Sequence, residues 1–227
     1  MVIARSTAWP SKALRLARLL VLWLAAAQAV AQSPPPAPAR GKTLGITELR
    51  ATPAGGISVG SFHVEFEATQ LDDIANRISR QLMQHEGDAG ESVYWLCYTF
   101  TEKTQKERLW FISDGEMGGA NHLVTGVIAI RLSPTATKTT ECRAPSMPVD
   151  KIAFDNGLWL GQSKQELRSK LGAEPQANRG WWSYRYSGTT PVQSGGRTTT
   201  FDVTSQLDVE LRDSRIAAIR ASQIYSN

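Results

Sequence analysis

The chain is poor in the side chains that most often carry out catalysis. Among its 227 residues there are three histidines and two cysteines. The spacings of a zinc protease (HExxH), a redox pair (CxxC), an EF-hand loop and a phosphate-binding loop do not occur in the sequence. Because the possible general bases are so few, the sequence favours a binding role over an enzymatic one, and it indicates neither a metal nor a cofactor.

Long hydrophobic runs are also missing. The apolar stretch LLVLWLAAAQAV, residues 19–30, has twelve residues, too few to cross a bilayer of about 30 Å at about 1.5 Å per residue. It follows four basic residues and ends in Ala29-Val30-Ala31, a small-x-small pattern. We therefore expect residues 1–31 to be a secretory signal peptide that is cleaved near Ala31. The expected location is the periplasm or the cell exterior, without a transmembrane anchor, and peripheral association with the envelope is compatible with it.

An excess of charge of one sign is absent once this segment is set aside. The whole chain has 25 basic and 21 acidic residues. The predicted signal peptide holds four basic residues and no acidic one, so the remainder has 25 − 4 = 21 basic against 21 acidic residues. A balanced chain offers no general attraction to nucleic acid, and we do not expect nucleic acid as a partner.

The two cysteines, Cys97 and Cys142, are expected to form a disulfide, the usual state of paired cysteines in an exported protein of this size. Closing a loop of about 45 residues would stabilise the fold by roughly 4 kcal/mol.

The expected domain organisation has three parts after the signal peptide. Residues 32–42, QSPPPAPARGK, predict an extended proline-rich spacer. Residues 43–145 and 146–227 predict two α+β units, each a strand, a helix and a three-strand meander. The predicted fold class is therefore α+β, with the two units in tandem and helices on one face of antiparallel sheets.

The second unit has the clearer pattern. Ser163 and Glu166 form the S-x-x-E capping box of a helix start, and Gly172 is placed where a helix ends. In the first unit, apolar residues recur at helical spacing from Leu71 to Leu82 and predict a helix over that range. Aromatic, strand-favouring runs, SVYWLCYTF and WWSYRYSG, follow the two predicted helices. A two-residue corner, Asp213-Ser214, is predicted between the last two strands.

The motif around the second predicted helix resembles a known group of exported proteins. Leu160-Gly161-Gln162-Ser163 leads into the helix, and Leu171-Gly172-Ala173-Glu174-Pro175 ends it. This run is similar to the helix-plus-meander units of the outer-membrane assembly lipoprotein BamE/SmpA and of the β-lactamase inhibitor proteins, most clearly over residues 156–227. The resemblance implies their fold and a non-catalytic habit of binding proteins.

Alternation along the last strands indicates a polar face that could bind a partner. Trp181 and Arg185 share one face of their predicted strand, and Asp208 and Glu210 share the matching face of the next. Arg197 is expected at the tip of a polar loop over residues 187–204. We therefore expect an exported non-catalytic protein-binding module, such as an inhibitor, an immunity-like protein or an envelope-assembly accessory, with a protein of unknown identity as its partner.

The alternative is a periplasmic hydrolase or metal-dependent enzyme. His63, Glu65 and Glu67 lie on one face of a predicted strand. Asp114, Glu116 and His122 gather in a glycine-rich turn. Exposure of a polar sheet face and ordinary turn chemistry explain both groups without any activity. An enzyme would require these side chains to converge around a pocket.

Overall fold

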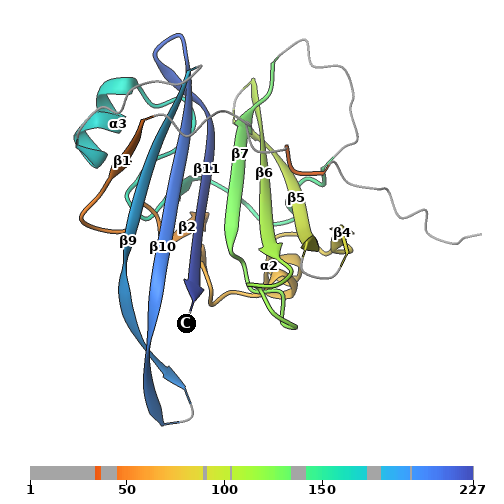
Figure 1. The fold of residues 1–227 in the computed structure, drawn as a ribbon. Coiled ribbons are helices and arrows are strands. Elements are labelled where there is room, and N and C mark those ends of the chain that lie inside the picture. The colour runs from red at the N-terminus through yellow and green to blue at the C-terminus, as the bar shows by residue number, and fades with distance from the viewer. Residues whose placement is uncertain are drawn as a thin grey trace, which may run out of the picture. The chain divides into compact units, whose positions relative to one another are not determined.

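Two β-sheets make up most of the structure (Figure 1). The computed structural model describes residues 34–36, 45–88, 91–102, 104–133, 142–172, 180–194 and 196–226. The elements in chain order are β1 (Ile46–Glu48), β2 (Gly56–Val59), β3 (Phe62–Glu65), α2 (Leu71–Arg77), β4 (Gln84–Glu86), β5 (Val93–Glu102), β6 (Gln105–Asp114), β7 (Gly126–Arg131), β8 (Ile152–Phe154), α3 (Lys164–Leu171), β9 (Trp181–Ser194), β10 (Arg197–Arg212) and β11 (Arg215–Ser226).

The larger sheet has eight strands in the order β1-β9-β10-β11-β7-β6-β5-β4. Strands β5, β6 and β7 form one antiparallel meander, and β9, β10 and β11 form another. The two meanders join where β7 pairs with β11, from Ala218 opposite Ile130 to Ser222 opposite Gly126. Because β1 runs parallel to β9, the sheet is mixed.

The turn between β10 and β11 follows directly from its two residues. Asp213 and Ser214 have φ angles of 51° and 59°. Positive φ at both central residues is the geometry of a type I′ turn, whose twist matches that of the flanking strands. The two-residue corner predicted from the sequence is present.

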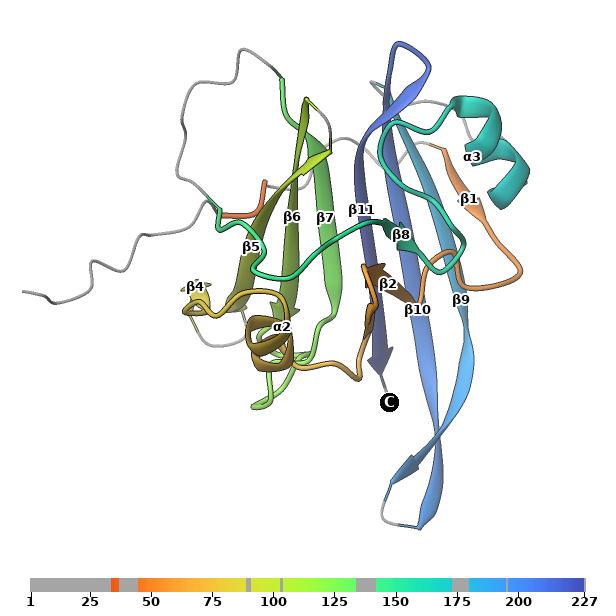
Figure 2. The ribbon, with the colours of Figure 1, turned by 180° about the vertical axis from the view of Figure 1, so that it is seen from behind.

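One face of the large sheet, here called the inner face, covers the main core. A three-stranded sheet, β3-β2-β8, and helix α2 lie against it, in front of the large sheet in Figure 2. Helix α3 covers its β9 end, where Lys164 Nζ lies 4.8 Å from the ring centre of Trp182. The largest fully buried side chains of this core include Tyr98, Phe111 and Tyr184 from the large sheet, with Phe66 and Phe154 from the covering layer.

Helix α3 begins as the sequence predicted. The Ser163 hydroxyl accepts from the backbone N–H of Glu166 at 3.2 Å, and the Glu166 carboxylate accepts from the backbone N–H of Ser163 at 2.6 Å. Gly172 follows the last turn with a φ of 84°. Both ends of the helix are therefore fixed by local side-chain and backbone chemistry.

Helix α2 is shorter than predicted, and the expectation that it reaches Leu82 is wrong. It ends at Arg77, and the carbonyl groups of the next two residues bond to other parts of the chain instead of to a further helical turn. The backbone N–H of Ser146 donates to the carbonyl of Ile78 at 2.8 Å, and the hydroxyl of Tyr98 donates to the carbonyl of Ser79 at 3.1 Å. Leu82 consequently lies outside the helix with 68% of its surface exposed.

The predicted fold class is also wrong. The protein is mostly β, with two helices of seven and eight residues in the described part of the chain, rather than a balanced α+β fold with antiparallel sheets and helices on one face. Tertiary hydrogen bonds shorten α2, as described above. The pairing of β7 with β11 joins the two meanders into one large sheet, and the parallel pairing of β1 with β9 makes that sheet mixed rather than antiparallel.

The segment 187–204, predicted as a loop, is a β-ribbon instead. Strand β9 continues to Ser194 and β10 begins at Arg197, with Thr198 opposite Gln193 and Phe201 opposite Thr190. The ribbon projects beyond the rest of the sheet in Figure 1. Its threonines favour extended backbone because they are β-branched, so strand propensity outweighs the loop-like polarity of this stretch.

Candidate binding face

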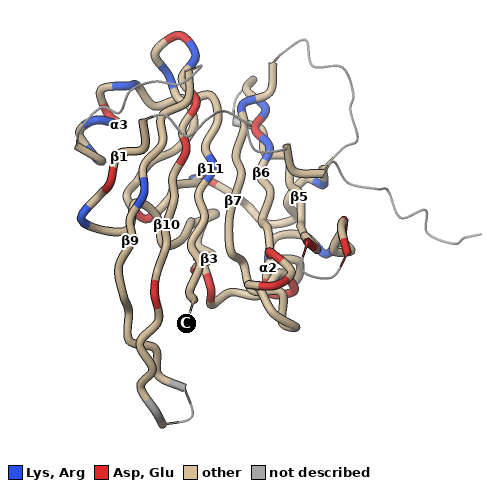
Figure 3. The backbone as a smooth tube through the Cα atoms, viewed as in Figure 1, with Lys and Arg blue, Asp and Glu red and all other residues tan. Residues whose placement is uncertain are grey.

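The second face of the large sheet, here called the outer face, is turned away from both helices and from the small sheet. Side chains alternate between the two faces, as the sequence pattern predicted for β9 and β10. Trp182 and Tyr184 are buried in the core, whereas Trp181 and Arg185 lie on the outer face and are partly exposed. Figure 3 shows charged positions of both signs on the strands at this end of the sheet.

The strand register brings four of the predicted binding residues into one patch. Glu210 lies directly opposite Trp181. Asp208 lies opposite Ser183, between the rows that hold Trp181 and Arg185. All four side chains are partly exposed, so the patch consists of one tryptophan, one arginine and two carboxylates.

The carboxylates of the patch are already oriented by neighbouring side chains. Arg212 donates to both oxygens of Glu210, at 3.0 and 2.9 Å. The side-chain amide of Gln206 lies 3.1 and 3.0 Å from the two oxygens of Asp208. By contrast, Nε of Arg185 is buried and has no hydrogen-bond partner among the described residues. The patch thus combines two oriented carboxylates with a guanidinium group whose Nε is not used by the surrounding described side chains.

The remaining predicted binding residue, Arg197, is not part of this patch. It begins β10 at the far end of the projecting ribbon, and its side chain lies outside the described residues. The expectation that it sits at a loop tip is replaced by a position at the start of a strand, next to Gly196, whose φ is 77°.

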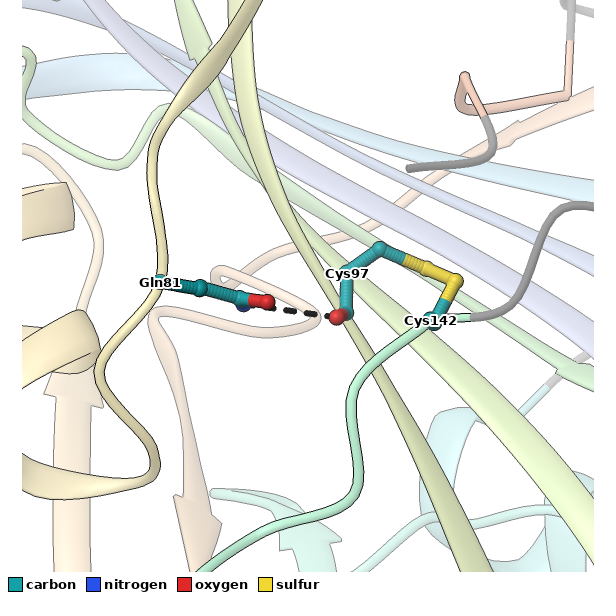
Figure 4. Close-up of a disulfide and its surroundings, with 3 residues drawn as sticks. All are labelled: Gln81, Cys97 and Cys142. Atoms are coloured by element: carbon teal, nitrogen blue, oxygen red, sulfur yellow. Dashed lines mark hydrogen bonds between the residues drawn. A yellow bond between two sulfur atoms is a disulfide. The ribbon is translucent and has the colours of Figure 1, made fainter. Parts of the chain in front are cut away.

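The outer face of the first meander is apolar and holds the disulfide. Cys97 and Cys142 are bonded, with their Cα atoms 5.0 Å apart, as predicted (Figure 4). The side chain of Gln81 donates to the carbonyl of Cys97 at 3.3 Å. Trp95 and Trp110 pack around the same cluster and are 5% and 2% exposed. This part of the outer face is therefore shielded, in contrast to the patch around Trp181.

A cavity of about 700 Å³ opens on the outer face where the two meanders meet. Its walls include Trp95, Ile112 and Ile224, together with two residues of the proline-rich segment, Pro35 and Pro36. Arg220 of β11 also lines it and donates from Nη2 to the carbonyl of Pro36 at 3.1 Å. Burial lowers the pKa of Arg220, whereas the nearby Asp208 carboxylate raises it.

The residues of the alternative, enzymatic hypothesis are distributed over several local contacts. His63 on β3 lies 3.8 Å from Asp155 and 3.2 Å from the hydroxyl of Ser58. His122 lies against Tyr94, with ring centres 4.1 Å apart. Glu65 ends β3 with its side chain exposed, and its backbone N–H donates to the hydroxyl of Thr69 at 2.9 Å.

The glycine-rich turn contributes local structure and one unusual carboxyl environment. Asp114 accepts from the backbone N–H of Met117 at 3.4 Å, and Glu116 is exposed. Burial and, to a smaller extent, the Asp114 carboxylate together raise the pKa of the nearby Glu67 to about 7. Glu67 and His122 both have positive φ, 61° and 49°, which is uncommon for residues other than glycine.

Within the described residues, no group of three or more histidine, cysteine, aspartate or glutamate side chains could hold a metal ion. The same part of the chain has no helix that is long and apolar enough to cross a membrane. No protein-family model, curated protein or solved structure matches this chain. The resemblance to the BamE and inhibitor proteins accordingly stays a prediction.

Sequence reasoning missed one residue of interest, Arg220. It is a single charge between Ile219 and Ala221, and strand alternation could have placed it on the face opposite these two apolar neighbours. The sequence pattern groups Glu67 with His63 and Glu65 on one face of a predicted strand, but β3 ends at Glu65 and Glu67 has a left-handed backbone with a φ of 61°.

Proposed function

We propose that this protein is an exported, non-catalytic protein-binding module, and that the patch formed by Trp181, Arg185, Asp208 and Glu210 contacts its partner. The observation that carries the proposal is the register of β9 and β10, which sets a partly exposed tryptophan opposite one carboxylate and beside a second. Tryptophan and arginine are the residue types that most often dominate the energy of protein interfaces.

The electrostatics of the patch support a protein surface as the ligand. Two carboxylates are held in place by Arg212 and Gln206, whereas Nε of Arg185 has no hydrogen-bond partner in the described part of the chain. Fixed groups of both signs select a partner through complementary charge more than through area. An inhibitor, an immunity-like protein or an envelope-assembly accessory would each use such a surface.

The proposed location is the periplasm or the cell exterior. The Cys97–Cys142 disulfide supports it, because disulfides form and persist in oxidising compartments. The predicted signal peptide over residues 1–31 belongs to the same proposal.

The test is affinity capture from the envelope fraction, followed by measured affinities for each captured protein. Trp181→Ala and Arg185→Ala are each expected to weaken binding of the relevant partner at least tenfold. A matched control is Asp72→Ala with Arg77→Ala, because both residues are exposed on α2, on the other side of the sheet. Unchanged affinity in both patch variants, or an equal loss in the α2 control, would refute the proposed surface.

A further inference from the structure

The cavity on the outer face is lined in part by a distant segment of the protein's own chain. Pro35 and Pro36 form part of its wall, although they are more than 180 positions before Arg220 in the sequence. The contact is specific, since Nη2 of Arg220 donates to the carbonyl oxygen of Pro36. A short piece of the proline-rich segment is thus held on the sheet by a charge-assisted hydrogen bond.

The cavity has the chemistry that recognises extended proline-containing chains. Consecutive prolines have no N–H groups, so they present ring faces and carbonyl oxygens, and a binding site must supply apolar walls and hydrogen-bond donors. Ile112 and Ile224 supply apolar wall, and Trp95 supplies an aromatic one. Arg220 and Trp95 supply donors.

The side chains of Trp95 and Arg220 could each donate a further hydrogen bond. Among the described residues, neither Nε1 of Trp95 nor Nε of Arg220 has a hydrogen-bond partner, and both atoms are buried. A buried N–H that makes no hydrogen bond is destabilising, because it has lost its hydrogen bonds to water. Each could therefore gain from a carbonyl group beyond that of Pro36, which points to a longer or better-placed segment as the preferred occupant.

Acidic side chains in the lining of the cavity restrict the charge of the segments that can bind there. Glu86, Glu91 and Asp114 line the cavity beside the apolar wall. An acidic peptide would be repelled by these carboxylates, whereas an uncharged or basic one would not.

We propose that this cavity is a receptor for extended, proline-containing peptide segments without acidic residues, and that residues Pro34–Pro36 occupy it as an intramolecular ligand. A partner's segment of the same kind binds by displacing them. The inference does not rest on the proposed function of the Trp181 patch, because it concerns a different part of the outer face and different residues.

The test uses a synthetic peptide with the sequence of residues 32–42, QSPPPAPARGK, and the full-length protein. A triple variant, Pro34→Gly with Pro35→Gly and Pro36→Gly, weakens the segment of the chain that competes with the peptide. A segment tethered by a short linker competes at an effective concentration of roughly millimolar. The peptide is therefore expected to bind the triple variant at least tenfold more tightly than the unaltered protein, as measured by calorimetry.

Two substitutions in the triple variant test the donors. Trp95→Phe keeps an aromatic wall and removes the indole N–H, and Arg220→Leu removes the guanidinium. Each is expected to weaken peptide binding at least fivefold, and Arg220→Lys is expected to restore part of the loss because it keeps a cationic donor. Far-UV circular dichroism and retention of the disulfide confirm that each variant is folded.

Two controls distinguish binding in this cavity from nonspecific binding and from binding at the Trp181 patch. A peptide with glycine in place of every proline is expected to bind at least tenfold more weakly, and Trp181→Ala is expected to leave peptide affinity unchanged. The proposal is overturned if the peptide binds the triple variant and the unaltered protein with equal affinity. It is also overturned if the peptide fails to bind the triple variant at a peptide concentration of about 1 mM, which is about the effective concentration expected for the tethered segment. It is also overturned if sedimentation shows that the segment inserts into a second copy of the chain.

Discussion

The substitution Glu67→Gln is expected to change how the stability of the protein depends on pH. In the folded protein, burial and the Asp114 carboxylate raise the pKa of Glu67 from 4.5 to about 7. The unfolded chain loses the same proton near the ordinary value. Between these two pH values the folded state binds more protons than the unfolded state, so the free energy of unfolding falls as pH rises.

The magnitude follows from the size of the pKa change. A rise from 4.5 to about 7 corresponds to at most about 3.4 kcal/mol at about 1.4 kcal/mol for each tenfold change in proton affinity. Glu67 is only partly buried, and solvent screening reduces the expected effect to about 1–2 kcal/mol. The loss begins near pH 4.5, is complete above about pH 7, and is absent below both values.

Urea unfolding followed by tryptophan fluorescence, at intervals from about pH 4 to about pH 8, measures this dependence. Glu67→Gln is expected to match the unaltered protein at the acidic end and to exceed its stability by about 1–2 kcal/mol at the basic end. Asp114→Asn is expected to move the midpoint of the effect to lower pH, and Glu116→Gln, at an exposed position in the same turn, serves as the control. A stability difference that is the same at every pH would refute the reasoning.

Three further outcomes are expected. Replacing Cys97 and Cys142 by serine should lower the free energy of unfolding by about 4 kcal/mol, measured by urea unfolding, because a loop of 45 residues is no longer closed. Glu107→Ala should cost about 3 kcal/mol in the same assay, because the buried Glu107 carboxylate accepts from the indole N–H of Trp159 at 2.8 Å and lies 3.7 Å from Nε of Arg131. Glu107→Gln should cost less, because the amide oxygen of glutamine can still accept the hydrogen bond from Trp159. Ser163→Ala should cost about 1 kcal/mol through loss of the helix cap, and Ser163→Asp should restore most of it. A cost below about 0.5 kcal/mol, the level of an ordinary surface substitution, would contradict the corresponding argument.

Local chemistry was predictable from the sequence where short-range rules decide the structure. The Ser163 capping box, the Asp213-Ser214 turn and the disulfide all depend on residue type at fixed spacing, and all three are present. Strand alternation also placed Trp181 on the polar face. For the capping box and the turn, all the interacting groups lie within a few consecutive residues. For the disulfide, the chain has two cysteines, so a single pairing is possible.

The failures arose where distant segments compete for the backbone. The periodicity through Leu82 fits a helix, but the carbonyl of Ile78 accepts from Ser146, far along the chain. The fold class failed for the same reason, since nothing local indicates that β7 pairs with β11. The cavity was not predictable because it combines Pro36 with Arg220, two residues at opposite ends of the chain.

The lengths of the outermost strands affect how this protein behaves at high concentration. The eight-stranded sheet ends in β1 and β4, each of three residues, and a strand so short offers little backbone for edge-to-edge pairing with another molecule. Of the described strands, β1 pairs with β9 only over residues 183–185, so the projecting part of β9 has an open side. Pro191 lies in that part and has no N–H to donate. Resistance to edge pairing at this part of β9 would therefore depend on Pro191, and a β-branched residue in its place would favour pairing with another molecule at high concentration.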